Sequence, residues 1–168
     1  MRLLVTLLWA GALCFGQMSG TLSGRRAPGF SLPDSSFHRY DLQDYRGKWL
    51  LLDFLESHCP HCRVLAKVLE QVKAKYGARV GILEIVLAPP ETMQTVSEYV
   101  KDSHVTSPVL FDQGQVAASY FNATPEHNSF DTPHLFIIDP NGMIVKDFAQ
   151  YEGQTLIKEL DALMAAHR

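Results

Sequence analysis

Residues 49–77 read WLLLDFLESHCPHCRVLAKVLEQVKAKYG, an apolar run followed by two cysteines and a segment with helical periodicity. The run from Trp49 to Leu55 has the length of a strand, and its nearly unbroken apolar character is typical of a strand buried on both faces. From Cys59 onward, apolar residues recur every three or four positions until Gly77, a residue suited to ending a helix. The sequence therefore predicts a buried strand that leads directly into an amphipathic helix, with the cysteine pair at the junction.

The two cysteines fall at the expected start of this helix. Unpaired N–H groups and the positive end of the helix dipole favour a thiolate there, so Cys59 is the expected nucleophile. Cys62 lies one turn further on, where we expect it to be buried and able to form a reversible disulfide with Cys59. His61 would place positive charge beside the thiolate, and Pro60 removes no hydrogen bond in a first helical turn. No cofactor is expected beyond this redox-active disulfide.

The segments on either side of this unit predict an α/β order, with parallel connections early and an antiparallel hairpin late. Pro89-Pro90 is expected to open a helix, because proline is tolerated in a first helical turn. Asn141-Gly142 predicts the hairpin, since this pair accommodates the positive φ angles of a tight turn. Further strands are expected at 30–32, 80–87, 108–111, 135–138 and 143–145, and further helices at 115–121 and 156–164. One three-layer domain accommodates all of these elements.

The composition excludes several classes of protein. The 168 residues are 46% apolar and 20% charged, which is typical of one soluble globular domain. Lysine and arginine number 15 against 18 acidic residues, so the formal net charge is −3. No segment combines clustered basic residues with interleaved aromatics, and nucleic acid is therefore not an expected partner.

The first 16 residues have the pattern of a secretory signal peptide, with one charge at Arg2 and then an apolar stretch over residues 3–16. This stretch is short for a membrane-spanning helix, which needs about 20 apolar residues, but an uncleaved anchor that tethers the protein through residues 3–16 stays open. Residues 17–26 are expected to form a linker and residues 27–168 the folded domain. An extracytoplasmic location, periplasmic or secreted, is therefore expected.

The segment from Asp53 to Arg63 resembles the active-site segment of the thioredoxin superfamily. Three further stretches, APGFSLPD at 27–34, YRGKW at 45–49 and TPHLFIIDPNG at 132–142, are similar to the TlpA/ResA-type, AhpC/TSA-related branch. The resemblance covers about residues 26–165. It implies a thioredoxin-like three-layer fold, with a mixed central sheet, helices on both faces and an inserted helix-strand unit between Leu87 and Phe111.

The resemblance also implies an activity. Members of this branch are extracytoplasmic thiol-disulfide oxidoreductases that contribute to cell redox homeostasis. This chain would exchange a reversible Cys59–Cys62 disulfide with partner proteins. The implied partners are protein thiols or disulfides and an upstream redox protein.

The resemblance assigns roles to residues beyond the cysteines. Pro133 matches the family's cis-proline facing the disulfide, and Thr132 beside it would help to hold the partner's backbone. Asp53 matches the buried aspartate of thioredoxin itself, the proton acceptor for Cys62. In the TlpA/ResA branch that role is associated with a glutamate after the next strand, for which Glu91 is the alternative match.

The sequence departs from the family pattern at two histidines. His58 replaces the aromatic residue that usually precedes the first cysteine, and His61 replaces the proline common before the second. The Pro60-His61 pair instead resembles the dipeptide of the DsbA-type oxidants. The direction of electron flow therefore stays open between oxidant and reductant.

Two other functions stay open. A thioredoxin-like metallochaperone would use the soft and imidazole ligands that suit copper or zinc. Its candidate ligands are His58, Cys59, His61, Cys62, His127 and His134. The AhpC/TSA-like start also allows a peroxiredoxin-like antioxidant enzyme, although such enzymes need a proline and a threonine at the places seven and three residues before the reactive cysteine, which Leu52 and Glu56 occupy here.

Overall fold

The computed structural model describes residues 22–149 and 153–167. The expected signal peptide, residues 1–16, and the membrane tether considered within it lie outside the described residues. Within the described part of the chain, no helix has the length and apolar character needed to cross a membrane.

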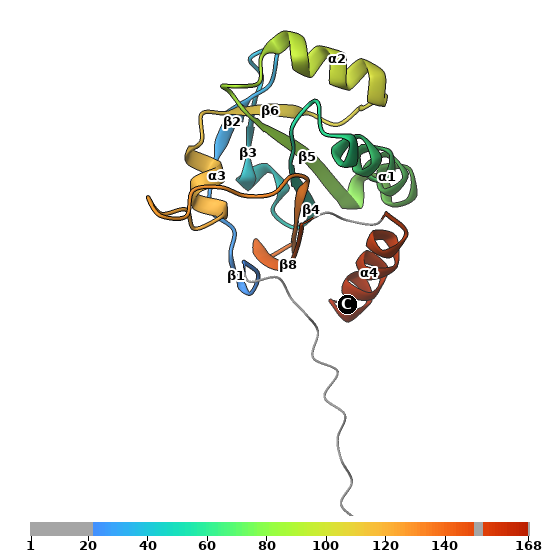
Figure 1. The fold of residues 1–168 in the computed structure, drawn as a ribbon. Coiled ribbons are helices and arrows are strands. Elements are labelled where there is room, and N and C mark those ends of the chain that lie inside the picture. Colours follow the sequence, from blue (N-terminus) through green and yellow to red (C-terminus); the bar gives the residue numbers. More distant parts are fainter. Residues whose placement is uncertain (1–21, 150–152, 168) are drawn as a thin grey trace, which may run out of the picture.

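A six-stranded mixed sheet with the order β1-β8-β7-β4-β5-β6 forms the middle layer of the molecule (Figure 1). Its strands are β1 (Arg25–Arg26), β4 (Trp49–Phe54), β5 (Val80–Leu87), β6 (Val109–Asp112), β7 (His134–Ile138) and β8 (Met143–Ala149). β4, β5 and β6 are parallel, whereas β7 runs antiparallel to β4, and β8 runs antiparallel to both β7 and β1. A second, two-stranded sheet pairs β2 (Ser31–Pro33) with β3 (Arg39–Asp41). The mixed sheet, parallel early and antiparallel late, confirms the prediction.

Helices cover both faces of the sheet. α1 (Pro60–Tyr76) and α4 (Gly153–Ala166) lie side by side on one face, and α3 (Gln115–Tyr120) lies on the other (Figure 1). The inserted unit between β5 and α3 consists of α2 (Met93–Ser103) and β6, as the resemblance implies. Two short 3-10 helices, η1 (Leu42–Tyr45) and η2 (Gly77–Arg79), complete the fold, and Gly77 ends α1 with a φ of +56°.

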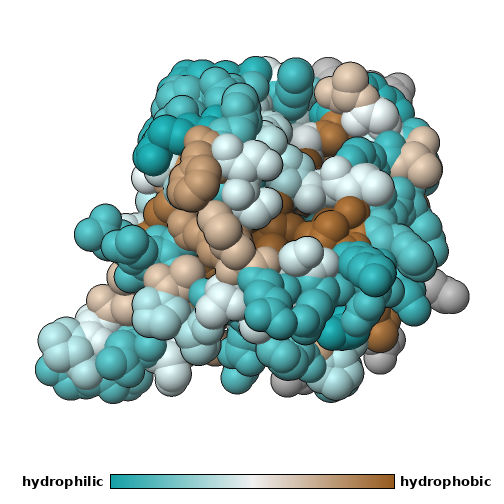
Figure 2. Space-filling model, turned by 90° about the horizontal axis from the view of Figure 1, so that it is seen from above, coloured by the Kyte–Doolittle hydropathy of each residue, from teal (hydrophilic) through white to brown (hydrophobic). Residues whose placement is uncertain are grey.

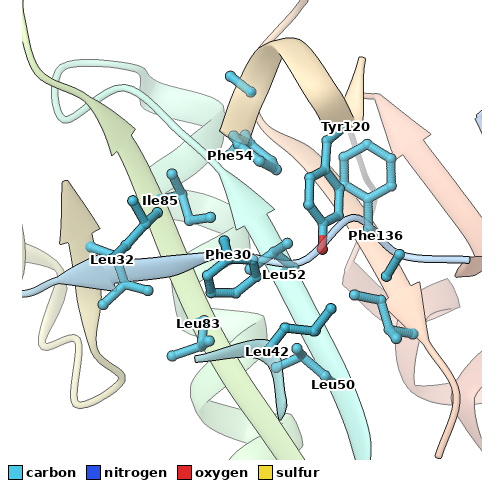
Figure 3. Close-up of a cluster of buried hydrophobic side chains, with 14 of the residues drawn as sticks. Phe30, Leu32, Leu42, Leu50, Leu52, Phe54, Leu83, Ile85, Tyr120 and Phe136 are labelled. Atoms are coloured by element: carbon cyan, nitrogen blue, oxygen red, sulfur yellow. The ribbon is translucent and has the colours of Figure 1, made fainter. Parts of the chain in front are cut away.

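Alternate residues of β4 enter two separate cores, which explains why all six of its residues are buried. Leu52 and Phe54 point to the α3 side, where Phe54, Tyr120 and Phe136 place their rings against one another (Figure 3). Leu51 points to the opposite side, against α1 and α4. Each large apolar side chain buried in this way contributes about 1.5–3 kcal/mol to stability. The strand that leads to the cysteines is therefore fixed from both faces.

The prediction that Pro89-Pro90 opens a helix is wrong. Both prolines lie in the turn that follows β5, each preceded by a cis peptide bond, and α2 begins only at Met93. Thr92 is the N-cap, and its hydroxyl oxygen accepts the N–H of Thr95 at 3.2 Å while the Thr95 hydroxyl oxygen accepts the N–H of Thr92 at 3.0 Å. These side-chain oxygens satisfy N–H groups that a helix start leaves free, which a proline ring cannot do.

Two details of the sheet differ from the sequence prediction, one at its first strand and one at the β7–β8 turn. Arg25 and Arg26, placed in the linker, form β1 and pair with β8, so the sheet begins two residues before the predicted domain start. In the β7–β8 hairpin only Gly142 of the Asn141-Gly142 pair has a positive φ, at +81°. The Asp139 carboxylate closes this turn, because it accepts the N–H groups of Asn141 at 2.9 Å and Met143 at 2.8 Å.

Candidate functional site

The cysteine pair lies where β4 leads into α1. Cys59 is the N-cap of α1, with an extended backbone (φ −72°, ψ 119°), and its sulfur accepts the backbone N–H of Cys62 at 3.3 Å. Pro60 is the first helical residue, as predicted, where its missing N–H leaves nothing unpaired. Cys59 is partly exposed and Cys62 is completely buried, and both are free thiols. A partner protein can therefore reach the sulfur of Cys59 but not that of Cys62.

The environment of Cys62 opposes ionisation. Burial raises the pKa of the Cys62 thiol, and the neighbouring Cys59 and Asp53 raise it further. A thiol held in the neutral form is a poor nucleophile, since the thiolate is the attacking species. Any reaction at Cys62 consequently needs a nearby group that accepts its proton.

Asp53 is the acidic residue on β4 that faces this region. Its exposed fraction is 0%, and neither of its carboxylate oxygens has a hydrogen-bond partner among the described residues. Burial raises the pKa of Asp53 well above its ordinary value, and Glu84 and Cys59 add to the effect. A buried carboxyl group without partners destabilises a fold, and groups of this kind are common at functional sites, which makes Asp53 a candidate functional residue.

A second buried carboxyl group, which the sequence analysis missed, faces Asp53. Glu84 on β5 is the register partner of Asp53 on β4, and the Tyr99 hydroxyl of α2 donates to Glu84 Oε2 at 2.5 Å. Burial raises the pKa of Glu84 to about 7, although the bond from Tyr99 opposes this. The available signal was a single glutamate inside the apolar run of residues 80–87.

The loop that ends at β7 brings two predicted residues to the cysteines. The Cys59 sulfur lies 3.8 Å from the carbonyl oxygen of Thr132, to which its S–H can donate. The Thr132–Pro133 peptide bond is cis, as the resemblance implies, and Pro133 is buried. Two segments 73 residues apart in the chain therefore meet at the exposed sulfur.

Glu91 contacts the loop before the cysteines. Its carboxylate accepts the backbone N–H of Ser57 at 2.7 Å and the hydroxyl of Thr95 at 2.5 Å. Burial acts to raise the pKa of Glu91, but these hydrogen bonds leave it below the ordinary value. This environment favours the charged carboxylate, which fixes the loop, and a lowered pKa makes Glu91 a weaker proton acceptor than Asp53.

The histidines considered as metal ligands are dispersed. His58 is exposed and its Nδ1 lies 2.9 Å from the Ser57 hydroxyl, and His61 is exposed on the first turn of α1. His134 is buried, with its Nε2 3.2 Å from Asp147 Oδ2. Within residues 22–149 and 153–167, no three or more histidine, cysteine or acidic side chains are grouped so that they could hold a metal ion.

The face of the molecule seen from above α2 has a distinct distribution of polarity. Figure 2 shows apolar side chains gathered in the middle of this face, with hydrophilic side chains surrounding them. An apolar centre within a polar rim is the usual composition of a surface that meets another protein.

Comparisons with known proteins agree with this geometry. A thiol-disulfide oxidoreductase, ResA of Bacillus cereus, is 25% identical over 165 residues, which cover 94% of this chain and 91% of the relative. The thioredoxin-like protein YneN of Bacillus subtilis is 28% identical over 126 residues, covering 74% of this chain and 70% of the relative.

Solved structures share the fold. A thiol:disulfide interchange protein of the thioredoxin family from Chlorobium tepidum superposes with a TM-score of 0.70 at 19% identity, covering 83% of this chain and 94% of that chain. A thiol-disulfide oxidoreductase from Bacteroides fragilis superposes with a TM-score of 0.67 at 21% identity, covering 83% and 99%. The model of the AhpC/TSA family matches residues 23–147. This chain belongs to the AhpC/TSA family.

Proposed function

We propose that this chain is a thiol-disulfide oxidoreductase that exchanges a reversible Cys59–Cys62 disulfide with the thiols or disulfides of partner proteins. One observation carries the proposal: the partly exposed sulfur at the N-cap of α1 accepts an N–H from the buried Cys62 one turn further on. ResA of Bacillus cereus, a thiol-disulfide oxidoreductase, and the thiol:disulfide interchange protein of Chlorobium tepidum and thiol-disulfide oxidoreductase of Bacteroides fragilis support the same activity.

The reaction proceeds through a mixed disulfide. The Cys59 thiolate attacks one sulfur of a partner disulfide, the partner's S–S bond breaks, and its second sulfur leaves with the electron pair. Cys62 then transfers its proton to Asp53 and attacks Cys59 Sγ. The Cys59–Cys62 bond forms, and the first partner sulfur leaves as a thiolate. Two electrons have passed to the partner, and the same steps in reverse return them.

The location and partners of the protein are part of the proposal. The leader pattern of residues 1–16 supports an extracytoplasmic site of action, periplasmic or secreted, where disulfides persist. A redox protein that resets the cysteine pair after each turnover completes the cycle. Thr132 and Pro133 would hold the partner's backbone beside Cys59.

A trapping experiment tests the proposal. Cys62→Ser removes the sulfur that resolves the mixed disulfide, so this variant should accumulate covalent adducts with a protein carrying an accessible disulfide. The matched control, Cys59→Ser, keeps the buried sulfur and should form no adduct, with Cys14→Ser present in both variants so that no third thiol reacts. Adducts are counted by mass spectrometry before and after reduction. Equal labelling of both variants would contradict the assignment of Cys59 as the attacking residue.

A further inference from the structure

The reaction above uses one buried carboxyl group, but two are present. Asp53 and Glu84 are register partners in the parallel β4–β5 pair, and directly opposite residues on adjacent strands project from the same face of a sheet. Their exposed fractions are 0% and 1%. The residues two positions further along the chain, Leu55 just after the end of β4 and Val86 in β5, belong to the buried cluster that contains Cys62. Both carboxyl groups therefore face the region of the resolving sulfur.

Hydrogen bonding distinguishes the two carboxyl groups. The Tyr99 hydroxyl donates to Glu84 Oε2 at 2.5 Å, whereas the oxygens of Asp53 have no partner among the described residues. A hydrogen-bond donor stabilises the charged form of a carboxyl group, and two like charges side by side in an apolar interior oppose each other. The negative charge therefore belongs on Glu84, and the proton belongs on Asp53.

Other ionisable groups also act on the pair. Cys59, the N-cap of α1, and Cys62 in its first turn interact electrostatically with Asp53. Glu70 and Lys73, also on α1, interact with Glu84. From α2, Tyr99 interacts with both carboxyl groups, and on the far side of β4 the register partner of Asp53 is the apolar Leu135. Glu70 and Lys73 act on Glu84 in opposite directions, so Tyr99 is the group that breaks the symmetry of the pair.

We propose that Glu84, held by the Tyr99 hydroxyl, is a positioning residue that keeps a proton on Asp53 for delivery to Cys62. The proposal rests on the exchange reaction proposed above and deepens it. When a partner thiolate attacks Cys59 Sγ of the oxidised protein, a Cys59–partner bond forms and the Cys59–Cys62 bond breaks. Cys62 leaves with the electron pair and takes the proton of Asp53, and the partner thiol is the reductant. Closing the disulfide returns the proton to Asp53.

The test measures the opening of the disulfide in the full chain carrying Cys14→Ser, which leaves Cys59 and Cys62 as its two cysteines. Dithiothreitol opens the oxidised protein in a single turnover, and the rate is divided by the dithiothreitol thiolate concentration at each pH. The corrected rate should fall at alkaline pH, as Asp53 loses its proton. A ¹³C NMR titration of the Asp53 carboxyl carbon in the oxidised protein reports the same ionisation directly.

Glu84→Gln removes the charge but keeps the shape and the bond with Tyr99. We expect it to move the alkaline midpoint of the rate and the NMR midpoint to lower pH by about 1 unit or more. Tyr99→Phe keeps the buried ring and should move both midpoints in the same direction by less, and it carries the test if Glu84→Gln does not fold. Glu98→Gln, an exposed glutamate adjacent to Tyr99 in the chain, is the matched control and should move neither.

Midpoints that stay at the wild-type value in both Glu84→Gln and Tyr99→Phe would overturn the role of Glu84 while leaving the exchange reaction intact. A wild-type protein in which dithiothreitol opens no Cys59–Cys62 disulfide would overturn the exchange reaction, and the role of Glu84 with it. The two failures are therefore distinguishable.

Discussion

Asp53 and Glu84 occupy matching positions on neighbouring strands, and neither carboxyl group reaches solvent. Apolar residues of similar size would stabilise the sheet at both positions, because a buried acidic group loses its hydration. The fold keeps two such groups beside a buried thiol. We interpret this arrangement as stability given up for control of a proton.

Asp53→Asn should make the protein more stable and at the same time less active in disulfide exchange. The folded pKa of Asp53 lies above its unfolded value of 3.8, so the native state holds a proton that the unfolded chain releases, and stability falls as the pH rises above 3.8. The variant should therefore unfold with a free energy about 1–3 kcal/mol higher at pH 7 and exchange disulfides more slowly. Urea unfolding between pH 4 and pH 8 measures the first effect. A variant less stable than wild type at pH 7 would count against this account.

Glu91→Gln tests the alternative proton acceptor. We expect the variant to lose about 1–2 kcal/mol of stability, because a charged acceptor of the Ser57 N–H and the Thr95 hydroxyl becomes neutral. Exchange should slow uniformly across the pH range. Glu126→Gln, in an exposed loop, is the control. A shift of the pH midpoint in Glu91→Gln would instead assign the proton transfer to Glu91.

The buried His134 should make stability depend on pH in the mildly acidic range. Burial lowers the pKa of His134 below its ordinary 6.5, although Asp147 opposes the shift. The unfolded chain therefore binds a proton that the native state excludes, and stability falls as the pH drops below 6.5. Thermal unfolding of His134→Gln should show a weaker decline between pH 6.5 and pH 5 than wild type. The exposed control His127→Gln should retain the full decline, and equal slopes in all three proteins would refute the assignment.

Leu160→Ala probes the docking of α4. Leu160 is a completely buried residue of α4 that packs in one cluster with residues of α1 and the sheet. The cavity left by the substitution should therefore lower the free energy of unfolding by about 2–5 kcal/mol. Leu163→Ala, at a partly buried position of the same helix, should have a smaller effect. Chemical denaturation compares the two variants. Equal losses would mean that α4 does not pack through Leu160.

Local sequence patterns were sufficient to predict the strand and the helix on either side of the cysteine pair. The apolar run from Trp49, the helical spacing after Cys59 and the cap at Gly77 each act over a few residues, and the structure confirms all three. The start of α2 was mispredicted, because the hydroxyl of Thr92 and not the preceding prolines satisfies the first N–H groups.

Contacts between segments that are far apart in the chain could not be predicted from the periodicity of apolar residues. The glutamate at position 84 is one acidic residue in an apolar strand, and its meaning depends on the register that places Asp53 opposite it. The approach of Thr132 to Cys59 likewise depends on how β7 pairs with β4, and only the family resemblance indicated it.

A redox titration tests the central claim most directly. The full chain with Cys14→Ser is equilibrated with glutathione mixtures of known potential, and the Cys59–Cys62 disulfide is quantified by mass spectrometry, with metal content measured in parallel. We predict one reversible two-electron transition that joins both cysteines in a single disulfide. A potential of about −120 mV would identify the protein as an oxidant, and a potential of about −270 mV or lower would identify it as a reductant. No reversible transition, together with stoichiometric copper or zinc, would contradict the account.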